Sequence, residues 1–243
     1  MIEVYNHKGE NSSLQEVGSL LLEEQKKTII SVIGAGGKSS LIQHLAECYS
    51  KQNKKVLVTT TTHIWRPTND TFAENIEAAE RVWAKKQYVV VGEETKQKKL
   101  KALSVEKLQP YWRRADVILI EADGAKGYPC KVSKTTEPII MPETTSVLMV
   151  MGLKTLSKRM RDVCFRCELV MDLLDEDRDH VMTEEDLMTI FRQECVDGMK
   201  DYKAKKYLVM NQADTKRCKK SGVGFCLEVM ETEGILGFVT KCM

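Results

Sequence analysis

A glycine-rich stretch near the start of the chain has the composition of a phosphate-binding loop. It lies between the β-branched, apolar residues 28–33 and the helical-period residues 41–45, and it reads Gly34-Ala35-Gly36-Gly37-Lys38-Ser39-Ser40. Glycines allow a tight turn with inward-facing N–H groups, and a helix that starts there adds the positive end of its dipole. Lys38 supplies an ammonium group for phosphate, and Ser39 supplies a hydroxyl for Mg²⁺. We therefore expect the loop to bind the phosphates of a nucleotide.

This loop is two residues shorter than the usual pattern. The pattern G-x-x-x-x-G-K-[ST] requires glycine at position 32, where the chain has Val32. Counted from Gly34, the motif is G-x-x-G-K-S, which resembles the compact phosphate loop of the Mur ligase and folylpolyglutamate synthetase ATPase domains. The alternative interpretation is a glycine turn that only packs a helix against a strand.

A second stretch supplies two carboxylates. Residues 116–120 indicate a strand buried on both faces, and Glu121-Ala122-Asp123-Gly124 follows it. An acidic residue at the end of such a strand, beside a phosphate loop, holds Mg²⁺ and can orient a nucleophile. Side chains two residues apart on a strand point the same way, so we expect Glu121 and Asp123 to share the ion, with Asp123 orienting water or substrate. The alternative is an exposed strand end that carries acids for solubility.

Polar residues also follow the neighbouring strand, residues 56–58. The carboxyl end of a parallel strand is where open α/β sheets bind ligands, so Thr61, Thr62 and His63 are candidates to contact the metal or the γ-phosphate. Threonine is also simply a good strand former. In the loop after the acidic pair, Lys126 could neutralise a phosphate or an anionic substrate. Lys126 and Lys131 could equally be ordinary loop cations.

A third stretch, the strand 206–210 followed by Asn211-Gln212-Ala213-Asp214, is a candidate base-binding segment. In GTPases the pattern N-K-x-D reads guanine, because the aspartate accepts hydrogen bonds from the ring N–H groups. Gln212 replaces the lysine. Asn211 and Asp214 are therefore candidate nucleotide-binding residues, although Asp214 could instead be the N-cap of a following helix.

Strands alternate with helices along the chain, which is typical of a parallel sheet. We predict strands over residues 2–5, 28–33, 56–58, 87–92, 116–120, 146–151 and 206–210, with short C-terminal strands at 225–230 and 235–240. We predict helices over residues 13–24, 38–52, 75–86, 105–114, 159–174 and 183–191. This order predicts an α/β fold with a doubly wound, mostly parallel sheet and helices on both faces.

We expect one P-loop-type nucleotide-binding domain over residues 1–243. It would comprise an N-terminal strand and helix extension (1–27), a half with the phosphate loop and metal residues (28–151), and a helical segment with the C-terminal strands (152–243).

Composition gives little reason to expect a highly charged partner. Lys and Arg total 37 against 35 Asp and Glu, so neither nucleic acid nor a membrane surface is expected to bind. No apolar run reaches the roughly 18 residues that span a bilayer, and the N-terminus lacks the layout of a signal peptide, so we expect a cytoplasmic protein. The cysteines are scattered, which favours free thiols. Cys164 and Cys167, within the predicted helix 159–174, would share one face as core residues.

Several of these blocks together resemble the selenium-dependent hydroxylase accessory protein family, often called YqeC. The resemblance covers about residues 15–215 and rests on blocks 31–40, 56–64, 118–127, 137–142, 181–186 and 209–214. It implies a role in the maturation of selenium-dependent molybdenum hydroxylases. It also implies that Gly34, Gly36, Gly37, Lys38 and Ser39 bind phosphate, that Thr61, Thr62 and His63 follow the second strand at the site, and that Glu121, Asp123, Gly124 and Lys126 surround the metal.

The preferred hypothesis is an accessory factor that binds ATP or GTP with Mg²⁺ and hydrolyses it, or uses it to activate or transfer a small ligand. Lys38 and the amides of residues 34–37 would stabilise phosphate charge, Ser39 and Glu121 would hold Mg²⁺, and Thr62 or His63 would sense the γ-phosphate. A second hypothesis is a nucleotide-gated binding module that holds and releases a client enzyme. It is supported by Glu121-x-x-Gly124, which is similar to a motif in nickel-delivering GTPases. A third is an inert scaffold.

Overall fold

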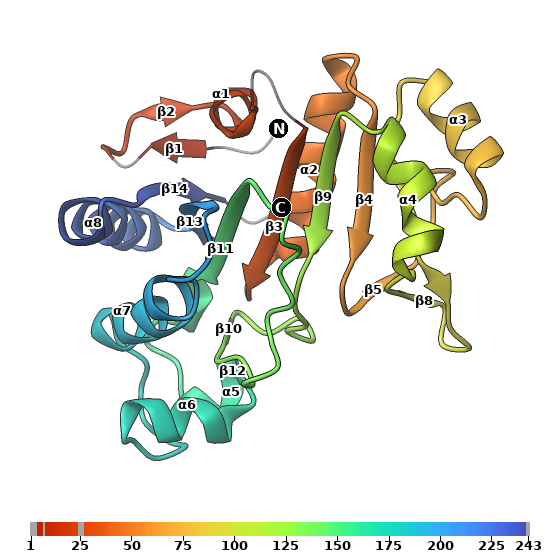
Figure 1. Ribbon diagram of the computed structural model, residues 1–243. Helices are drawn as coiled ribbons and strands as arrows, with labels where there is room; N and C mark the ends of the chain where they lie inside the picture. Colours follow the sequence, from red (N-terminus) through yellow and green to blue (C-terminus); the bar gives the residue numbers. More distant parts are fainter. Residues whose placement is uncertain (1–3, 7, 24–26, 242–243) are drawn as a thin grey trace.

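The largest element of the protein, in a computed structural model that describes residues 4–6, 8–23 and 27–241, is a nine-stranded sheet (Figure 1). Its strands, in spatial order, are β2 (Asn11–Ser12), β1 (Val4–Asn6), β14 (Leu236–Thr240), β13 (Lys205–Asn211), β11 (Ser146–Gly152), β3 (Thr28–Gly34), β9 (Val117–Glu121), β4 (Val56–Thr60) and β6 (Val89–Val90). The strands from β14 to β6 are parallel, and β1 and β2 add an antiparallel edge. The predicted α/β fold with a mostly parallel sheet is confirmed.

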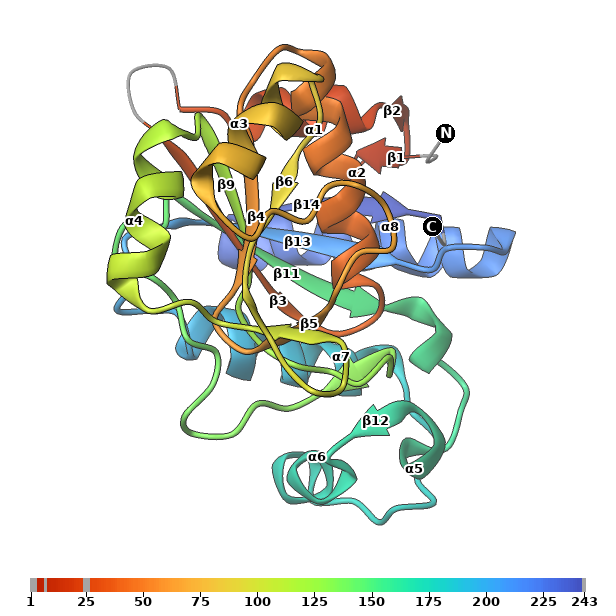
Figure 2. The ribbon, with the colours of Figure 1, turned by 90° about the vertical axis from the view of Figure 1, so that its right-hand side faces the viewer.

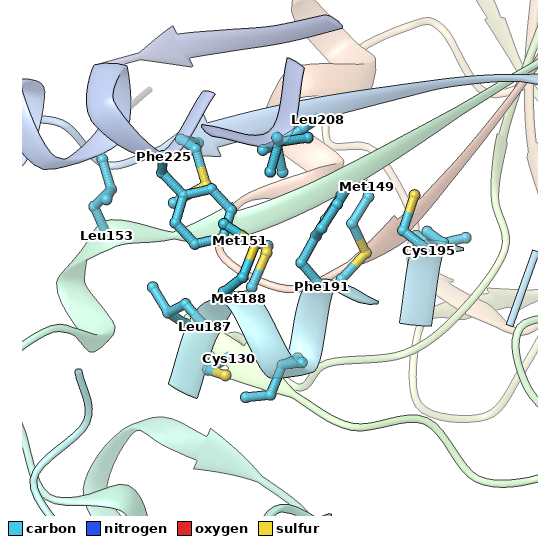
Figure 3. Close-up of a cluster of buried hydrophobic side chains, with 14 of the residues drawn as sticks. Cys130, Met149, Met151, Leu153, Leu187, Met188, Phe191, Cys195, Leu208 and Phe225 are labelled. Atoms are coloured by element: carbon cyan, nitrogen blue, oxygen red, sulfur yellow. The ribbon is translucent and has the colours of Figure 1, made fainter. Parts of the chain in front are cut away.

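Helices cover both faces of this sheet (Figures 1 and 2). One face carries α1 (Leu14–Leu21) and α2 (Lys38–Lys51), and the other carries α3 (Ile76–Ala84), α4 (Val105–Arg114), α7 (Glu184–Phe191) and α8 (Lys216–Glu233). Within β11, Leu148 and Val150 pack with α2, whereas Met149 and Met151 pack with α7 and α8 (Figure 3). This alternation follows from the two-residue period of a strand and explains why central strands are apolar throughout.

The sheet changes winding direction at β3. From β3 the chain passes to β4 and β6 on one side, returns to β9 next to β3, and then builds β11, β13 and β14 on the other side. In open α/β sheets, ligands bind at the carboxyl ends of strands where the strand order reverses. The glycine loop lies at this point, because it follows β3 directly.

Smaller elements complete the fold. Most of them follow or border the carboxyl ends of the strands, whereas the turn at Arg192–Asp197 lies near the amino ends of β13 and β14. The smaller elements are a three-stranded sheet of β5 (His63–Trp65), β8 (Lys99–Lys101) and β7 (Glu93–Glu94), a parallel pair of β10 (Cys130–Lys131) and β12 (Cys164–Phe165), helices α5 (Met160–Val163) and α6 (Cys167–Leu174), and helical turns at Leu153–Thr155 and Arg192–Asp197. The sequence patterns predicted none of these short strands.

Locally determined features agree well with the sequence. The bounds of α4 are those predicted, and capping boxes close the N-termini of α1 and α7 through Ser13 with Glu16 and through Thr183 with Asp186. The predictions of a strand over 2–5 and a helix over 13–24 correspond to β1 and α1, although residues 2, 3 and 24 lie outside the described residues.

The prediction of one helix over residues 159–174 is wrong. The chain instead forms α5, the strand β12 and then α6, because Arg166 adopts a left-handed backbone with φ of 57° and β12 pairs with β10. Cys164 therefore lies buried opposite Cys130, while Cys167 begins α6, so the two thiols share no helix face. All cysteines in the described part of the chain are free thiols.

The prediction of a strand over residues 225–230 is also wrong, because this segment belongs to α8. Its buried positions are Gly222, Phe225, Cys226 and Val229, which recur with helical spacing. The second apolar run does form a strand, β14. Within the described ranges, no helix combines the length and the apolar content needed to cross a lipid bilayer.

The start of α7 carries an ion pair whose contribution to stability depends on pH. His180 Nε2 lies 2.7 Å from Asp186 Oδ2, and this hydrogen bond raises the pKa of His180 above 6.5. Burial opposes a low pKa at Asp186, but hydrogen bonds from His180 and Thr183 lower it below 3.8. The stabilisation from His180 is complete below its unfolded pKa and is lost as pH rises through its folded pKa. The stabilisation from Asp186 is lost as pH falls below its unfolded value.

We therefore predict that His180→Ala lowers the free energy of unfolding more at about pH 5.5 than at about pH 9. Urea denaturation of the wild type and the variant at both pH values measures the difference. In an Asp186→Asn background the same substitution should lose most of its pH dependence. An equal cost at both pH values in the wild-type background would contradict the assignment.

Candidate functional site

The glycine loop joins β3 to α2 and requires glycine for two physical reasons. Gly34 has φ of 90°, and a Cβ atom there would lie 2.2 Å from the carbonyl oxygen of Val150. Gly37 has φ of 112°, and a Cβ atom there would lie 2.4 Å from Nδ2 of Asn211. Both positions therefore combine a left-handed backbone with a close approach to a neighbouring strand, which only glycine accommodates without strain.

Three amides of the loop donate to acceptors of the protein itself. The N–H of Gly34 donates to Asp123 Oδ2 at 2.8 Å, that of Ala35 to the Val150 carbonyl at 2.9 Å, and that of Gly36 to the Tyr128 carbonyl at 3.0 Å. The sequence-based expectation that the amides of residues 34–37 face phosphate therefore fits only Gly37 in this structure.

The first turn of α2 supplies the remaining donors. The helix begins at Lys38, and its N-cap Gly37 provides no side-chain hydrogen bond. The amides of Gly37, Lys38, Ser39 and Ser40 are the first four of this helix and have no intrahelical acceptors, so they form an anion-binding end with the helix dipole behind them.

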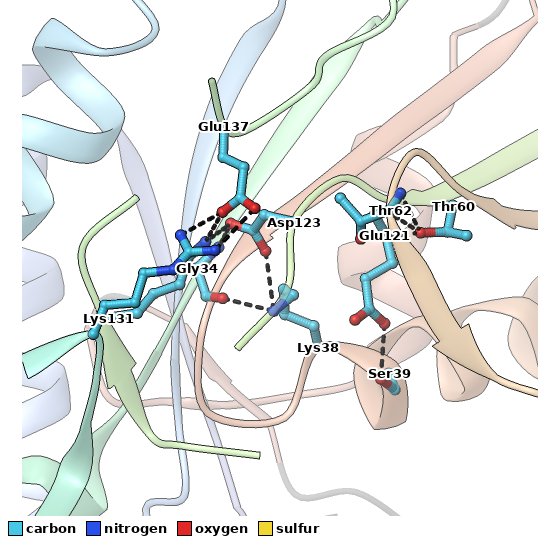
Figure 4. Close-up of polar contacts among 10 residues, drawn as sticks. Gly34, Lys38, Ser39, Thr60, Thr62, Glu121, Asp123, Lys131 and Glu137 are labelled. Carbon is cyan, nitrogen blue, oxygen red and sulfur yellow. Dashed lines mark hydrogen bonds and ion pairs between the residues drawn. The ribbon is translucent and has the colours of Figure 1, made fainter. Parts of the chain in front are cut away.

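Lys38 is almost completely buried, at 4% exposure. Its Nζ donates to the Gly34 carbonyl at 2.6 Å and lies 3.0 Å from Asp123 Oδ1 (Figure 4). The ammonium group thus contacts the start of its own loop and a carboxylate from the loop after β9.

Asp123 has no exposure and contacts two lysines. Its Oδ2 lies 2.7 Å from Nζ of Lys131, a side chain that is also fully buried, while Oδ1 faces Lys38. The expectation that Asp123 shares one ion with Glu121 does not fit this arrangement, because Glu121 contacts Ser39 and Asp123 contacts the lysines (Figure 4). The sequence leaves open whether Lys131 is an ordinary loop cation, and the structure buries it against Asp123.

The charged network continues to residues that the sequence patterns did not identify as functional. Glu137 Oε2 lies 3.8 Å from Lys131 Nζ, and Glu137 accepts two hydrogen bonds from the Arg166 guanidinium at 2.6 and 3.0 Å. These hydrogen bonds lower the pKa of Glu137 despite its partial burial. No local motif links residues 123, 131, 137 and 166, since only the folded chain brings them together.

Glu121 ends β9 and accepts a hydrogen bond from Ser39 Oγ at 2.7 Å. Its exposure is 7%, and burial raises its pKa against the opposing effects of Lys38 and the Ser39 hydrogen bond. A buried carboxylate beside a hydroxyl is a set of hard oxygen ligands suited to Mg²⁺, which takes one or two protein ligands and completes its shell with water and phosphate. These two residues therefore fit a magnesium ion. Among the described residues, His, Cys, Asp and Glu form no cluster of three or more that could hold a metal by themselves.

The threonines at and after the end of β4 have different roles, since Thr60 and Thr61 hold the backbone in place and Thr62 lines the cleft. Thr60 Oγ1 donates to the Glu121 carbonyl at 2.8 Å and accepts from the Thr62 amide at 2.9 Å, so it fixes the end of β4 to β9. Thr61 donates to the Ile139 carbonyl at 3.0 Å. Thr62 and the exposed His63 line the cleft beside the loop.

Asn211 connects the loop to the last two parallel strands. Its Nδ2 donates to the Gly36 carbonyl at 2.7 Å, and its Oδ1 accepts from Thr240 at 2.8 Å. Asp214 lies 2.9 Å from Lys154 and outside the cleft lining. The alternative that Asp214 caps the next helix is wrong, because Thr215 is the N-cap of α8.

A cleft of about 670 Å³ connects these groups, a size typical of small-molecule sites. Polar and aromatic side chains from seven segments of the chain line it, including Lys38, Ser39, Ser40, Thr62, His63, Trp65, Lys99, Glu121, Lys126, Tyr128, Glu137, Phe165, Arg166, Asn211 and Gln212. The structure thus places most of the predicted site residues in the lining of one cleft. Gly34, Ala35, Thr61, Asp123 and Asp214 lie outside this lining.

The arrangement defines an α/β protein with a strand, a glycine loop and a helix N-terminus at the switch point of a parallel sheet. The profile of the YqeC protein family matches residues 30–168, more than half of the sequence. The chain therefore belongs to the YqeC family.

Proteins similar to this chain include one relative in sequence and one solved structure. Escherichia coli (strain K12) has a relative named "Uncharacterized protein YqeC", which is 34% identical over 143 residues. The alignment covers 56% of this chain and 56% of the relative, so the chain spans only about half the length of the protein it matches. Among solved structures, chloroplast FtsY from Physcomitrella patens superposes with a TM-score of 0.47 and 15% identity, over 91% of this chain and 64% of that one.

We predict that Lys131→Met lowers the free energy of unfolding by about 3–5 kcal/mol, because it leaves one side of a buried carboxylate without a cation. Urea denaturation measures the loss. Lys101→Met is the matched control, since Lys101 pairs with Glu93 at the surface, 3.2 Å apart and about half exposed, and should cost less than about 1 kcal/mol. Similar losses in the two variants would show that the buried Lys131–Asp123 pair contributes no more to the free energy of unfolding than a surface pair does.

Proposed function

We propose that this protein binds ATP or GTP together with Mg²⁺ in the cleft and hydrolyses it, or uses it to activate a small ligand, as an accessory factor in the maturation of selenium-dependent molybdenum hydroxylases. One observation carries the proposal. Lys38, the Ser39–Glu121 pair and the first-turn amides of α2 meet at the carboxyl ends of β3 and β9. The pathway and the client are those that the resemblance described above implies.

Each residue has a role that follows from its position. The amides of Gly37 to Ser40 would bind phosphate oxygens. Lys38 would give up its hydrogen bond to the Gly34 carbonyl and donate to the phosphate oxygens instead. Ser39 and Glu121 would hold Mg²⁺. Held by these two oxygens, Mg²⁺ would supply positive charge against the phosphates of the nucleotide. Thr62 and His63 line the cleft where they could contact the γ-phosphate.

Asp123 has a different role from the one suggested by its place after the strand. Its full burial and its contacts with two lysines and an amide speak against contact with an attacking water. We assign it to positioning Lys38 and the start of the loop. Asn211 similarly positions the loop through Gly36. Asp214, which pairs with Lys154 outside the cleft lining, receives no role in base recognition here.

Calorimetric titration with ATP and GTP, each with and without Mg²⁺, tests the nucleotide site. We expect Lys38→Ala to weaken nucleotide binding by roughly a hundredfold or more, since it removes a charge-assisted partner of the phosphates. Lys51→Ala, at the opposite end of α2, should bind like the wild type. Wild-type affinity and turnover in Lys38→Ala would refute the proposal.

The metal assignment has its own test. Glu121→Gln should remove most of the Mg²⁺-dependent gain in nucleotide affinity, because it takes the charge from the carboxylate that faces Ser39. The same titrations with and without Mg²⁺ measure this gain. Glu47→Gln, an exposed change on α2, is the control. An unchanged Mg²⁺ dependence in Glu121→Gln would place the ion elsewhere.

A further inference from the structure

The cleft extends beyond the phosphate loop to an aromatic pair. Tyr128, in the loop after β9, and Phe165, at the end of β12, stack with ring centroids 6.1 Å apart and an interplanar angle of 25°. Both line the cleft, Tyr128 is 37% exposed and Phe165 is partly buried. An aromatic face that opens into a cleft is a surface on which another planar ring can stack.

Two cations flank the same rings. The guanidinium carbon of Arg166 lies 4.7 Å from the Phe165 centroid, and Nζ of Lys126 lies 5.2 Å from it. Glu137 neutralises Arg166 through two hydrogen bonds. Lys126 is exposed and forms an ion pair with none of the residues that the structure describes. Lys126 is therefore the cation in this part of the cleft that is available to an anion.

The backbone of both cations is held in a sparsely populated conformation. Lys126 has φ of 48° and Arg166 has φ of 57°, in the left-handed region that non-glycine residues rarely adopt. Such residues cluster at binding sites, where the surrounding structure maintains the strain. With the backbone in this conformation, both side chains lie beside the Phe165 ring and at the wall of the cleft.

The aromatic pair could bind either the base of the nucleotide or a second substrate, and its position relative to Lys38 bears on this choice. Lys38 and the Ser39–Glu121 pair mark where the β- and γ-phosphates would lie. From Lys38, contacts of 3.0, 2.7, 3.8 and 2.6 Å lead through Asp123, Lys131 and Glu137 to Arg166. The segment that carries Lys126 and Tyr128 also starts directly after the Glu121–Gly124 stretch. The aromatic pair therefore lines the same cleft as Lys38, Ser39 and Glu121, where a second substrate could meet the terminal phosphate.

We propose that Lys126, Tyr128, Phe165 and Arg166, here called the aromatic subsite, bind a second substrate, a planar aromatic molecule that carries a negative charge. Its ring stacks on Tyr128 and Phe165, and its anionic group contacts Lys126. This proposal rests on the proposed function, because the nucleoside triphosphate defines the neighbouring site, and it names the class of molecule on which the triphosphate acts.

The test uses the full chain with the nucleotide site filled by a non-hydrolysable ATP analogue and Mg²⁺. Calorimetry then measures binding of two planar anions, orotate and quinoline-2-carboxylate, against uracil and quinoline, which lack the charge, and cyclohexanecarboxylate, which lacks the aromatic ring. We expect saturable binding of at least one planar anion and affinities roughly tenfold or more weaker for the compounds that lack one feature.

Variants assign the binding to the subsite. Lys126→Ala and Tyr128→Leu should each weaken binding of the planar anion by roughly tenfold. Lys134→Ala, an exposed lysine outside the cleft lining, should have no effect. Thermal unfolding of each variant shows whether it is folded, and Lys126→Arg, which keeps the charge, should retain binding.

Three results would overturn the proposal. Binding of neither planar anion, while the ATP analogue binds normally, would remove the second substrate and leave the nucleotide site intact. Competition between adenosine and the planar anion for the subsite would assign it to the base of the nucleotide. Equal binding in Lys126→Ala and the wild type would place the anion elsewhere. Failure of the ATP analogue to bind, with the planar anion still bound, would instead overturn the proposed nucleotide function.

Discussion

The site depends on the buried carboxylate of Asp123. This group contacts Lys38, Lys131 and the amide of Gly34, and it has no exposure to solvent. Moving charges out of water is costly, and the cost is offset only when each charge keeps good partners. The second lysine would meet this condition even if Lys38 moved from Asp123 to a phosphate. Lys131 would then still neutralise the Asp123 carboxylate, so no buried charge would be left without a partner.

The same contacts explain how a loop shorter than the usual phosphate loop holds its shape. Its first three amides bond to Asp123, to β11 and to the segment after β9, and Asn211 fixes the Gly36 carbonyl from the other side. Thr240 in turn holds Asn211, so the last strand of the sheet supports a loop more than 200 residues earlier in sequence. The donors left for a ligand are concentrated in the first turn of α2, where the helix dipole acts in the same direction.

The sequence predicted what is encoded locally. The glycine loop, the buried strands and the caps of α1, α4 and α7 depend on residues within a few positions of each other. The loop and the central strands appear where expected. The break at Arg166 could not be predicted in this way, because the apolar spacing of residues 159–174 fits a helix and only the pairing of β12 with β10 interrupts it. The roles of Lys131 and Glu137 were missed for the same reason, since their partners are set by tertiary packing.

Charge balance connects the two halves of the cleft. Within the described residues, three cations (Lys38, Lys131, Arg166) and three carboxylates (Glu121, Asp123, Glu137) form the buried and half-buried network around the loop, so it is formally neutral without a ligand. A nucleoside triphosphate adds more negative charge than one freed lysine can balance in a region screened from water. A divalent ion held by Ser39 and Glu121 would supply part of the difference. Hydrolysis and nucleotide-gated binding both require this compensation, so the charge distribution favours an occupied site with Mg²⁺ whichever of the two follows.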